Sequence, residues 1–130
     1  MSAVLVVEDD PLLRESLAEY LEETGLDVLK AENGRAALEC LEKEPNPCLI
    51  LLDMAMPVMN GWEFREEQLR RRKIAKIPVV VVSADGRVEE KTRDIGAADG
   101  LSKPLDLDRL LSVISRFCRS FRGPAGIEFA

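Results

Sequence analysis

The sequence predicts a doubly wound α/β domain in which five parallel strands alternate with five helices. Three observations support this fold class. Short apolar runs alternate with segments of helical periodicity from end to end, which is typical of consecutive βα units. The 130 residues are enough for one hydrophobic core but not for two. The composition, 46% hydrophobic and 32% charged, is that of a folded globular protein rather than a disordered one.

The first half of the chain contains three of the predicted strands and two of the helices. We expect strands at residues 3–7, 27–31 and 48–52 and helices at residues 11–23 and 34–44. Pro11 suits the first turn of the first helix. Leu13, Leu17 and Leu21 recur at a spacing that places them on one face of that helix. Asn33 is a typical cap for the second helix, so both helices have a readable start.

The second half repeats the alternation and ends in a segment without periodicity. Helices are expected at residues 61–72, 87–95 and 107–117 and strands at residues 77–82 and 99–102. The strand at residues 77–82 is the clearest in the chain, with Pro78 at its entry where no ladder donor is needed. We therefore expect one domain over residues 1–119 and a flexible tail over residues 120–130, which contain Gly and Pro but show no pattern.

The composition argues against several classes of function. The chain has no histidine, which excludes a Ser-His-Asp triad, a His-ligated zinc and a phosphoryl acceptor on a histidine of its own. The net charge of -6 disfavours non-specific binding to nucleic acid or to an anionic membrane. The basic run Arg70–Lys73 is more typical of a solvated helix end than of a nucleic-acid site. Neither nucleic acid nor membrane is predicted as a direct partner.

The cysteines and the first residues indicate the compartment. Cys40, Cys48 and Cys118 follow no CxxC spacing and cannot all pair, so we expect neither a disulfide framework nor a zinc ribbon. The chain starts with a short apolar run followed by acids, which is unlike a signal peptide or a membrane span. These features predict a cytoplasmic protein with reduced thiols.

Charged and hydroxyl side chains follow four of the five predicted strands. In chain order these are Glu8, Asp9 and Asp10 after the first strand, Asp53 after the third, Ser83 after the fourth and Lys103 after the fifth. Ligands of doubly wound sheets bind beyond the carboxyl ends of the strands, where the winding reverses. With the strand order 2-1-3-4-5, the first and third strands are neighbours and their carboxylates converge. Because like charges repel and magnesium prefers hard oxygen donors, the pattern predicts a Mg2+ site.

Asp53 is the candidate nucleophile of this site. A carboxylate held beside Mg2+ can attack phosphorus and form an acyl phosphate. The transferred group carries negative charge on its oxygens, which an ammonium and a hydroxyl stabilise, and Lys103 and Ser83 supply these two groups. Each residue taken alone has a structural explanation, such as a turn, a helix cap or a solvated lysine. Their coincidence at four strand ends favours phosphoryl chemistry.

The motifs around these residues resemble those of a known family. The matching pieces are Val6-Val7-Glu8-Asp9-Asp10-Pro11, Leu51-Leu52-Asp53-Met54-Ala55-Met56-Pro57 with Gly61, Val82-Ser83-Ala84, and Ser102-Lys103-Pro104. Over residues 3–119 the chain resembles the receiver domains of two-component response regulators, most closely the stand-alone receivers. One such piece would be a weak signal, whereas four in order, each at the end of a predicted strand, are specific.

The resemblance implies a flavodoxin-like (βα)5 fold with strand order 2-1-3-4-5, and it implies a metal site. Glu8, Asp9 and Asp53 would hold Mg2+ through their carboxylates. Ala55 would add its backbone carbonyl. Asp10 matches a position that usually lies just outside the metal's ligands, so we rank it below its neighbours.

The resemblance also implies a set of catalytic contacts and partners. Asp53 would accept a phosphoryl group from a histidine kinase or a histidine phosphotransfer protein, while Ser83 and Lys103 contact that group. The Lys103-Pro104 peptide would be cis, which proline permits at small cost. The protein would catalyse its own phosphorylation and dephosphorylation without being an enzyme in the usual sense. It would then signal by contact with a downstream protein.

One departure from the family concerns the switch. Receivers commonly carry Tyr or Phe three residues before the lysine, and this chain has Gly100 there. The stretch from Ser83 to Lys103 also looks slightly short. We therefore expect phosphorylation to be intact and the downstream change to work differently, for instance by reordering residues 84–93.

Three other functions remain as alternatives. A phosphatase of the haloacid dehalogenase type also uses an aspartate nucleophile and magnesium, but it usually carries a second Asp two residues later, where this chain has Ala55. A flavin-binding module would need a phosphate loop rich in Ser, Thr and Gly after the first strand, where acids stand instead. A degenerate receiver that acts only as an interaction module would not need the intact acids, hydroxyl and lysine.

Overall fold

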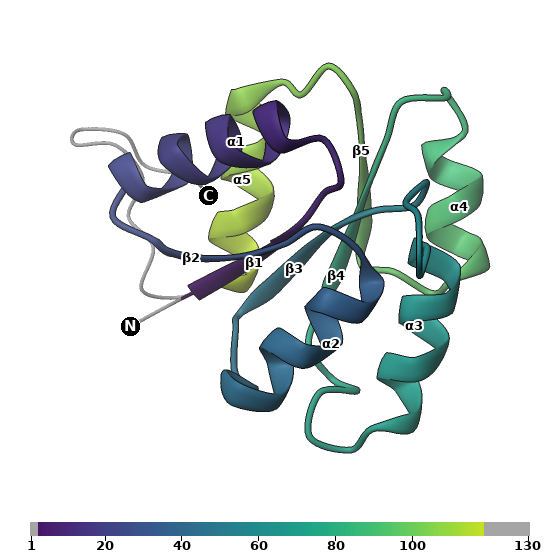
Figure 1. Ribbon diagram of the computed structural model, residues 1–130. Coiled ribbons are helices and arrows are strands. Elements are labelled where there is room, and N and C mark those ends of the chain that lie inside the picture. Colours follow the sequence, from purple (N-terminus) through teal and green to yellow (C-terminus); the bar gives the residue numbers. More distant parts are fainter. Residues whose placement is uncertain (1–2, 119–130) are drawn as a thin grey trace.

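Five parallel strands form one sheet in the computed structural model, which describes residues 3–118 (Figure 1). The strands are β1 (Ala3–Val7), β2 (Asp27–Ala31), β3 (Leu49–Asp53), β4 (Val79–Ser83) and β5 (Asp99–Ser102). Their order in the sheet is β2-β1-β3-β4-β5. The predicted fold class and strand order are confirmed. The predicted tail at residues 120–130 lies outside the described residues.

Within the part of the chain that the structure describes, five helices cover the two faces of this sheet. They are α1 (Pro11–Glu23), α2 (Gly34–Lys43), α3 (Gly61–Arg70), α4 (Val88–Asp94) and α5 (Leu107–Phe117). In Figure 1, α1 and α5 lie on one face and α2, α3 and α4 on the other. Alternate side chains of the strands feed the two core clusters, so the inner strands β1, β3 and β4 are buried on both faces.

The helix starts follow from side-chain caps at four of the five helices. Asp10 accepts hydrogen bonds from the backbone of the first turn of α1, and Asn33 and Asp106 cap α2 and α5 in the same way. A reciprocal pair, Asn60 with Glu63, closes the start of α3. The start of α4 has no side-chain cap, and this helix buries none of its residues. It is therefore the helix with the weakest local anchoring.

The boundaries differ from the predicted ones by one or two residues around α3 and β4. The helix expected at residues 61–72 ends at Arg70, because Arg71 takes an extended backbone conformation. The buried Gln68 amide then donates to the carbonyls of Ile74 and Ile77, which stabilises the turns that follow. These turns delay the next strand, which begins at Val79 rather than at Ile77.

The expectation that the cysteines stay unpaired is wrong for two of them. Cys48 and Cys118 form a disulfide, with their Cα atoms 5.3 Å apart. Cys48 directly precedes β3 and Cys118 directly follows α5, so the fold brings together two residues 70 positions apart in the sequence. Cys40 is a half-buried free thiol. Within residues 3–118, no helix is long and apolar enough to cross a membrane.

Candidate functional site

The register of the sheet places the acidic residues side by side. Val7 of β1 pairs with Leu52 of β3, so the next residues, Glu8 and Asp53, emerge at the same level at the carboxyl edge. Both are buried, with 4% and 6% of their surface exposed, whereas Asp9 is exposed. The apolar strands therefore hold two carboxylates in an environment where charge is costly.

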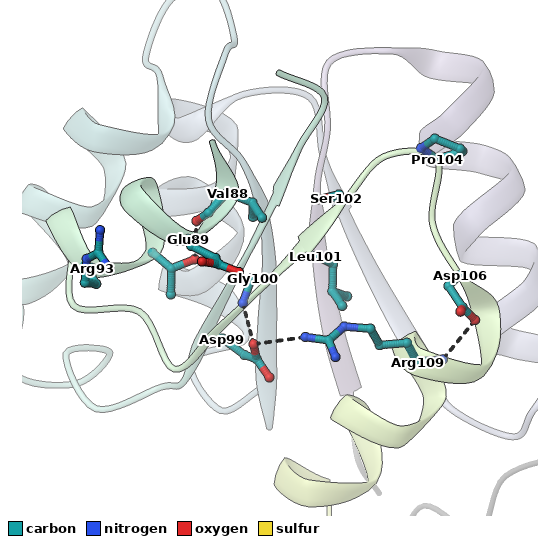
Figure 2. Close-up of a pocket in the computed structure, with 11 residues that line it drawn as sticks. Val88, Glu89, Arg93, Asp99, Gly100, Leu101, Ser102, Pro104, Asp106 and Arg109 are labelled. Atoms are coloured by element: carbon teal, nitrogen blue, oxygen red, sulfur yellow. Dashed lines mark hydrogen bonds and ion pairs between the residues drawn. The ribbon is translucent and has the colours of Figure 1, made fainter. Parts of the chain in front are cut away.

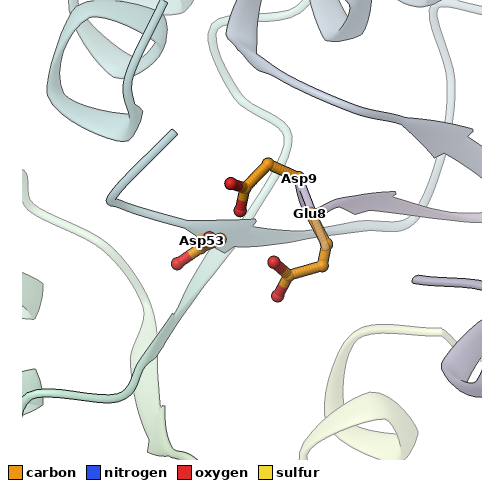
Figure 3. Close-up of side chains that lie close together, drawn as sticks. All are labelled: Glu8, Asp9 and Asp53. Carbon is orange, nitrogen blue, oxygen red and sulfur yellow. The ribbon is translucent and has the colours of Figure 1, made fainter. Parts of the chain in front are cut away.

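The three carboxylates form one cluster (Figure 3). Oxygens of Glu8, Asp9 and Asp53 all lie within 4.8 Å of one another. Burial, and then the negative charge of Glu8, raises the pKa of Asp53 to about 7. Three oxygen donors on adjacent strand ends, in a cluster that contains neither Cys nor His, match the ligand preference of Mg2+.

Lys103 is the positive charge that faces this cluster. Its Nζ lies 2.7 Å from Glu8 Oε1 and 3.7 Å from Asp53 Oδ1. The lysine follows β5, its backbone N–H donates to the Ser83 carbonyl, and its peptide bond to Pro104 is cis. Burial acts to lower the pKa of Lys103, but the hydrogen bond to Glu8 and the charge of Asp53 outweigh it and leave that pKa raised. The ammonium is therefore held charged beside both carboxylates, and the expected cis peptide is confirmed.

Ser83 is buried at the end of β4, and its hydroxyl is turned toward α4. Its Oγ donates to Asp85 Oδ1 at 3.2 Å and accepts from Lys91 Nζ at 2.9 Å. Lys91 also pairs with Asp85, at 2.6 Å, and its Nζ lies 5.7 Å from the centre of the Trp62 ring. The sequence analysis identified Ser83 but missed Asp85 and Lys91. No sequence pattern identifies Lys91 as part of the site, because only the packing of α4 brings it to the end of β4.

Ala55 and Asp10 lie near the cluster but take different positions from the three carboxylates. Ala55 is exposed in the loop that follows β3. Gly61, at the start of α3, closes that loop tightly, since a Cβ there would lie 2.8 Å from the Cα of Met54 and 2.9 Å from the Asp53 carbonyl oxygen. Asp10 points its carboxylate at the start of α1, where it caps the helix. Its lower rank among the acids agrees with this position.

Gly100 lies directly beneath α4. A Cβ at this position would collide with the Thr92 hydroxyl and would come within 2.7 Å of Val88 Cγ2. A groove of about 710 Å³ opens between α4, β5 and α5, next to the glycine (Figure 2). Charged, small and apolar residues line the groove, with Asp99 paired to Arg109, and none of the clustered carboxylates is among them. With α4 in this position, an aromatic side chain at residue 100 has no space.

Comparisons with known proteins agree with this geometry. A sequence model of the response regulator receiver domain matches residues 4–115. Protein PilH of Pseudomonas aeruginosa is 33% identical over 117 residues, covering 88% of this chain and 96% of that protein. The probable transcriptional regulator ycf29 of Pyropia yezoensis is 36% identical over 114 residues, covering 86% of this chain and 51% of that protein. The chain thus spans nearly all of one relative and about half of the other.

Solved structures show the same fold. A response regulator receiver protein from Pseudomonas putida superposes with a TM-score of 0.81 at 31% identity, covering 88% of this chain and 96% of that one. The chemotaxis protein CheY4 of Vibrio cholerae gives a TM-score of 0.81 at 29% identity, covering 90% of this chain and 98% of that one. Both similarities extend over the sheet and its helices.

Proposed function

The chain belongs to the response regulator receiver domain family, and we propose that Asp53 is its phosphoryl acceptor. Receiver domains are signalling modules rather than enzymes in the usual sense, and they act between histidine kinases and downstream targets. The observation that most supports Asp53 is its position: a buried carboxylate at the end of a central strand, with two further carboxylates within 4.8 Å and the Lys103 ammonium 3.7 Å away.

The residues present fit a Mg2+ ion. Glu8, Asp9 and Asp53 would hold it through carboxylate oxygens, and Ala55 through its backbone carbonyl. The ion would supply positive charge to the oxygens of the incoming phosphoryl group. It would also relieve the repulsion among the carboxylates, which the ammonium of Lys103 offsets only in part.

In the proposed transfer, Asp53 attacks the phosphorus as a carboxylate. One of its oxygens forms the new P–O bond while the bond from phosphorus to the imidazole nitrogen of the donor breaks. The bonding electron pair stays on that nitrogen, which takes a proton from solvent. Lys103 and the Ser83 hydroxyl would stabilise the charge on the transferred oxygens. The donor is a histidine kinase or a histidine phosphotransfer protein, since this chain has no histidine.

The switch that follows works without the usual aromatic side chain. The tight contact between Gly100 and α4 supports this part of the proposal, because it leaves no space for a ring at that position. Signalling then depends on a change in the segment 84–93 and on contact with a downstream protein.

The direct test is phosphorylation by acetyl phosphate in the presence of Mg2+, followed by intact-mass measurement. The parent protein is expected to gain the mass of one phosphoryl group, and Asp53→Asn is expected to gain none. Asp10→Asn is the matched control, because it removes a neighbouring acid while an asparagine keeps the helix cap. Chelation of the metal should abolish the gain.

Two results would contradict the proposal. One is a gain of the same mass by Asp53→Asn and by the parent protein, and the other is no gain of mass by the parent. Steady hydrolysis of a small phosphate ester, with turnover far beyond one equivalent, would instead support a phosphatase.

A further inference from the structure

The helix α4 has few attachments at its start, whereas its end is held by Arg65 of α3, which donates to the carbonyls of Ile95 and Gly96 at 2.9 Å each. It has seven residues, begins without a side-chain cap and buries none of them. Its Thr92 hydroxyl is occupied by the Val88 carbonyl of the same helix. The apolar contact of Val88 with the core is only partial, and Gly100 beneath it contributes no side chain. The polar contacts between α4 and the end of β4 are therefore important for holding α4 in place.

Lys91 supplies those polar contacts. Its side chain is 13% exposed, and its ammonium donates to Asp85 Oδ2 at 2.6 Å and to Ser83 Oγ at 2.9 Å. The same ammonium lies 5.7 Å from the centre of the Trp62 ring on α3. One lysine thus connects α4 to the carboxyl end of β4 and to the neighbouring helix, which lies beside α4 in Figure 1.

The Ser83 hydroxyl has a single proton, and this limits what it can contact at one time. In the structure that proton is donated to Asp85, while the oxygen accepts from Lys91. A phosphoryl oxygen on Asp53 accepts hydrogen bonds and cannot donate them. If Ser83 is to stabilise that oxygen, its hydroxyl has to turn away from Asp85. The phosphoryl group and the attachment of α4 therefore compete for the same hydroxyl.

We propose that Lys91 is a positioning residue that couples the acceptor site to α4 through the Ser83 hydroxyl. In the unphosphorylated protein, the contacts among Ser83, Asp85 and Lys91 fasten α4 to the end of β4. Phosphorylation of Asp53 withdraws the hydroxyl, and α4 is released from the strand. This inference rests on the proposed function of Asp53. The polar contacts among Ser83, Asp85 and Lys91 would then take the role that an aromatic side chain at residue 100 has in other receivers.

The experiment uses beryllofluoride with Mg2+ as a stand-in for the phosphoryl group. Binding is followed by fluorine NMR, α4 by amide hydrogen exchange of residues 88–95, and the lysine by the emission of Trp62, which is the single tryptophan of the chain. In the parent, beryllofluoride is expected to speed exchange in this segment by about tenfold or more, because α4 loses charge-assisted hydrogen bonds that Lys91 makes. The Trp62 emission is expected to change with it.

Three variants separate the link from other effects. In Lys91→Met, exchange in the segment is expected to be fast already, and beryllofluoride should bind without changing exchange or emission further. Asp85→Asn weakens the same contacts by changing the partner of Lys91, and the same result is expected. Asp85 is exposed, so the substitution should leave the fold intact. Arg93→Met removes a positive charge from the exposed side of the same helix and should respond as the parent does.

The outcomes distinguish this inference from the proposed function. If the parent does not bind beryllofluoride, both fall. If the parent binds it and the exchange of α4 stays unchanged, or if Lys91→Met and Asp85→Asn respond as fully as the parent, the coupling through Lys91 is wrong while the acceptor role of Asp53 stands.

Discussion

Asp53 and Asp85 lie at the carboxyl ends of the neighbouring strands β3 and β4, yet their environments are opposite. Asp53 ends β3 inside the protein, where burial and then the charge of Glu8 raise its pKa to about 7. Asp85 is exposed just after β4, where the hydrogen bond from Lys91, and then one from the Arg87 backbone, lower its pKa to about 2. The buried carboxylate is therefore kept close to its protonation point, whereas the exposed one is a permanent anion that holds a lysine.

The surroundings of the two residues differ in the same way. Around Asp53, the strands β1 and β3 are buried over almost their whole length and fix the carboxylates through the sheet register. Around Asp85, the uncapped α4 buries none of its own residues and is held through Lys91, the partly buried Val88 and hydrogen bonds from Arg65 to the carbonyls of Ile95 and Gly96 at its end. The difference teaches that the fold places Asp53, the proposed acceptor, on its most buried strands, while the adjacent helix is packed less deeply.

The largest expected difference between the two regions is in core stability. Leu52→Ala, in a strand residue that is 0% exposed, should lower the free energy of unfolding by about 2–5 kcal/mol. Val88→Ala in α4 should lower it by about 1 kcal/mol or less, because that side chain is only partly buried. Urea unfolding of both variants measures the contrast. Equal losses would show that α4 is as firmly packed as the inner strands.

The inner strands around Asp53 are also the part of the fold that the sequence predicts well. The runs at β1, β3 and β4 are apolar because both faces are covered, so they stand out from the amphipathic helices around them. In a parallel sheet every carboxyl end lies at one edge, and the residues that follow the strands must gather there. Glu8, Asp53 and Lys103 were found for this reason.

The loosely held part was not predictable in the same way. The contact of Lys91 with Ser83 depends on how a short helix lies on Gly100, and no local pattern encodes that. The pairing of Cys48 with Cys118 depends on where α5 ends relative to the start of β3. In both cases the information lies in how packed elements lie against one another, across 8 residues for Lys91 and Ser83 and across 70 for the cysteines, whereas strand ends and helix caps are local.

A smaller effect is expected from pH. The unfolded chain holds Asp53 near the ordinary pKa of 3.8, while the folded protein without metal raises that pKa to about 7. Between these values the folded state binds more protons, so stability should fall as pH rises through this window and level off above it. Between pH 5 and pH 7 the loss is on the order of 2 kcal/mol.

Asp53→Asn should remove this decline, because an amide does not titrate. The lowered pKa of Asp85 has the opposite effect on the pH dependence of stability. The ionised Asp85 stabilises the fold above about pH 4, and this stabilisation is lost as pH falls toward 2. Urea unfolding in the presence of a chelator, at pH values from 5 to 8, compares the parent with the variant. A decline of equal size in both would assign it to other groups.

The sharpest contrast between the two regions comes from two glycines, of which Gly100 is expected to have the smallest effect on global stability when it is substituted. Gly61→Ala pushes a Cβ against the backbone of Met54 and Asp53, which cannot yield, and should cost about 1–3 kcal/mol. Gly100→Ala instead pushes against Thr92 and Val88 of α4, a short helix that buries none of its residues and can shift as a whole, and the smaller entropy of an unfolded alanine offsets part of the strain. Its net cost should stay below about 1 kcal/mol, while amide exchange in α4 becomes faster. If Gly100→Ala instead destabilises the whole protein as much as Gly61→Ala does, α4 is not the yielding partner, and the distinction between a rigid acceptor region and a responsive helix does not hold.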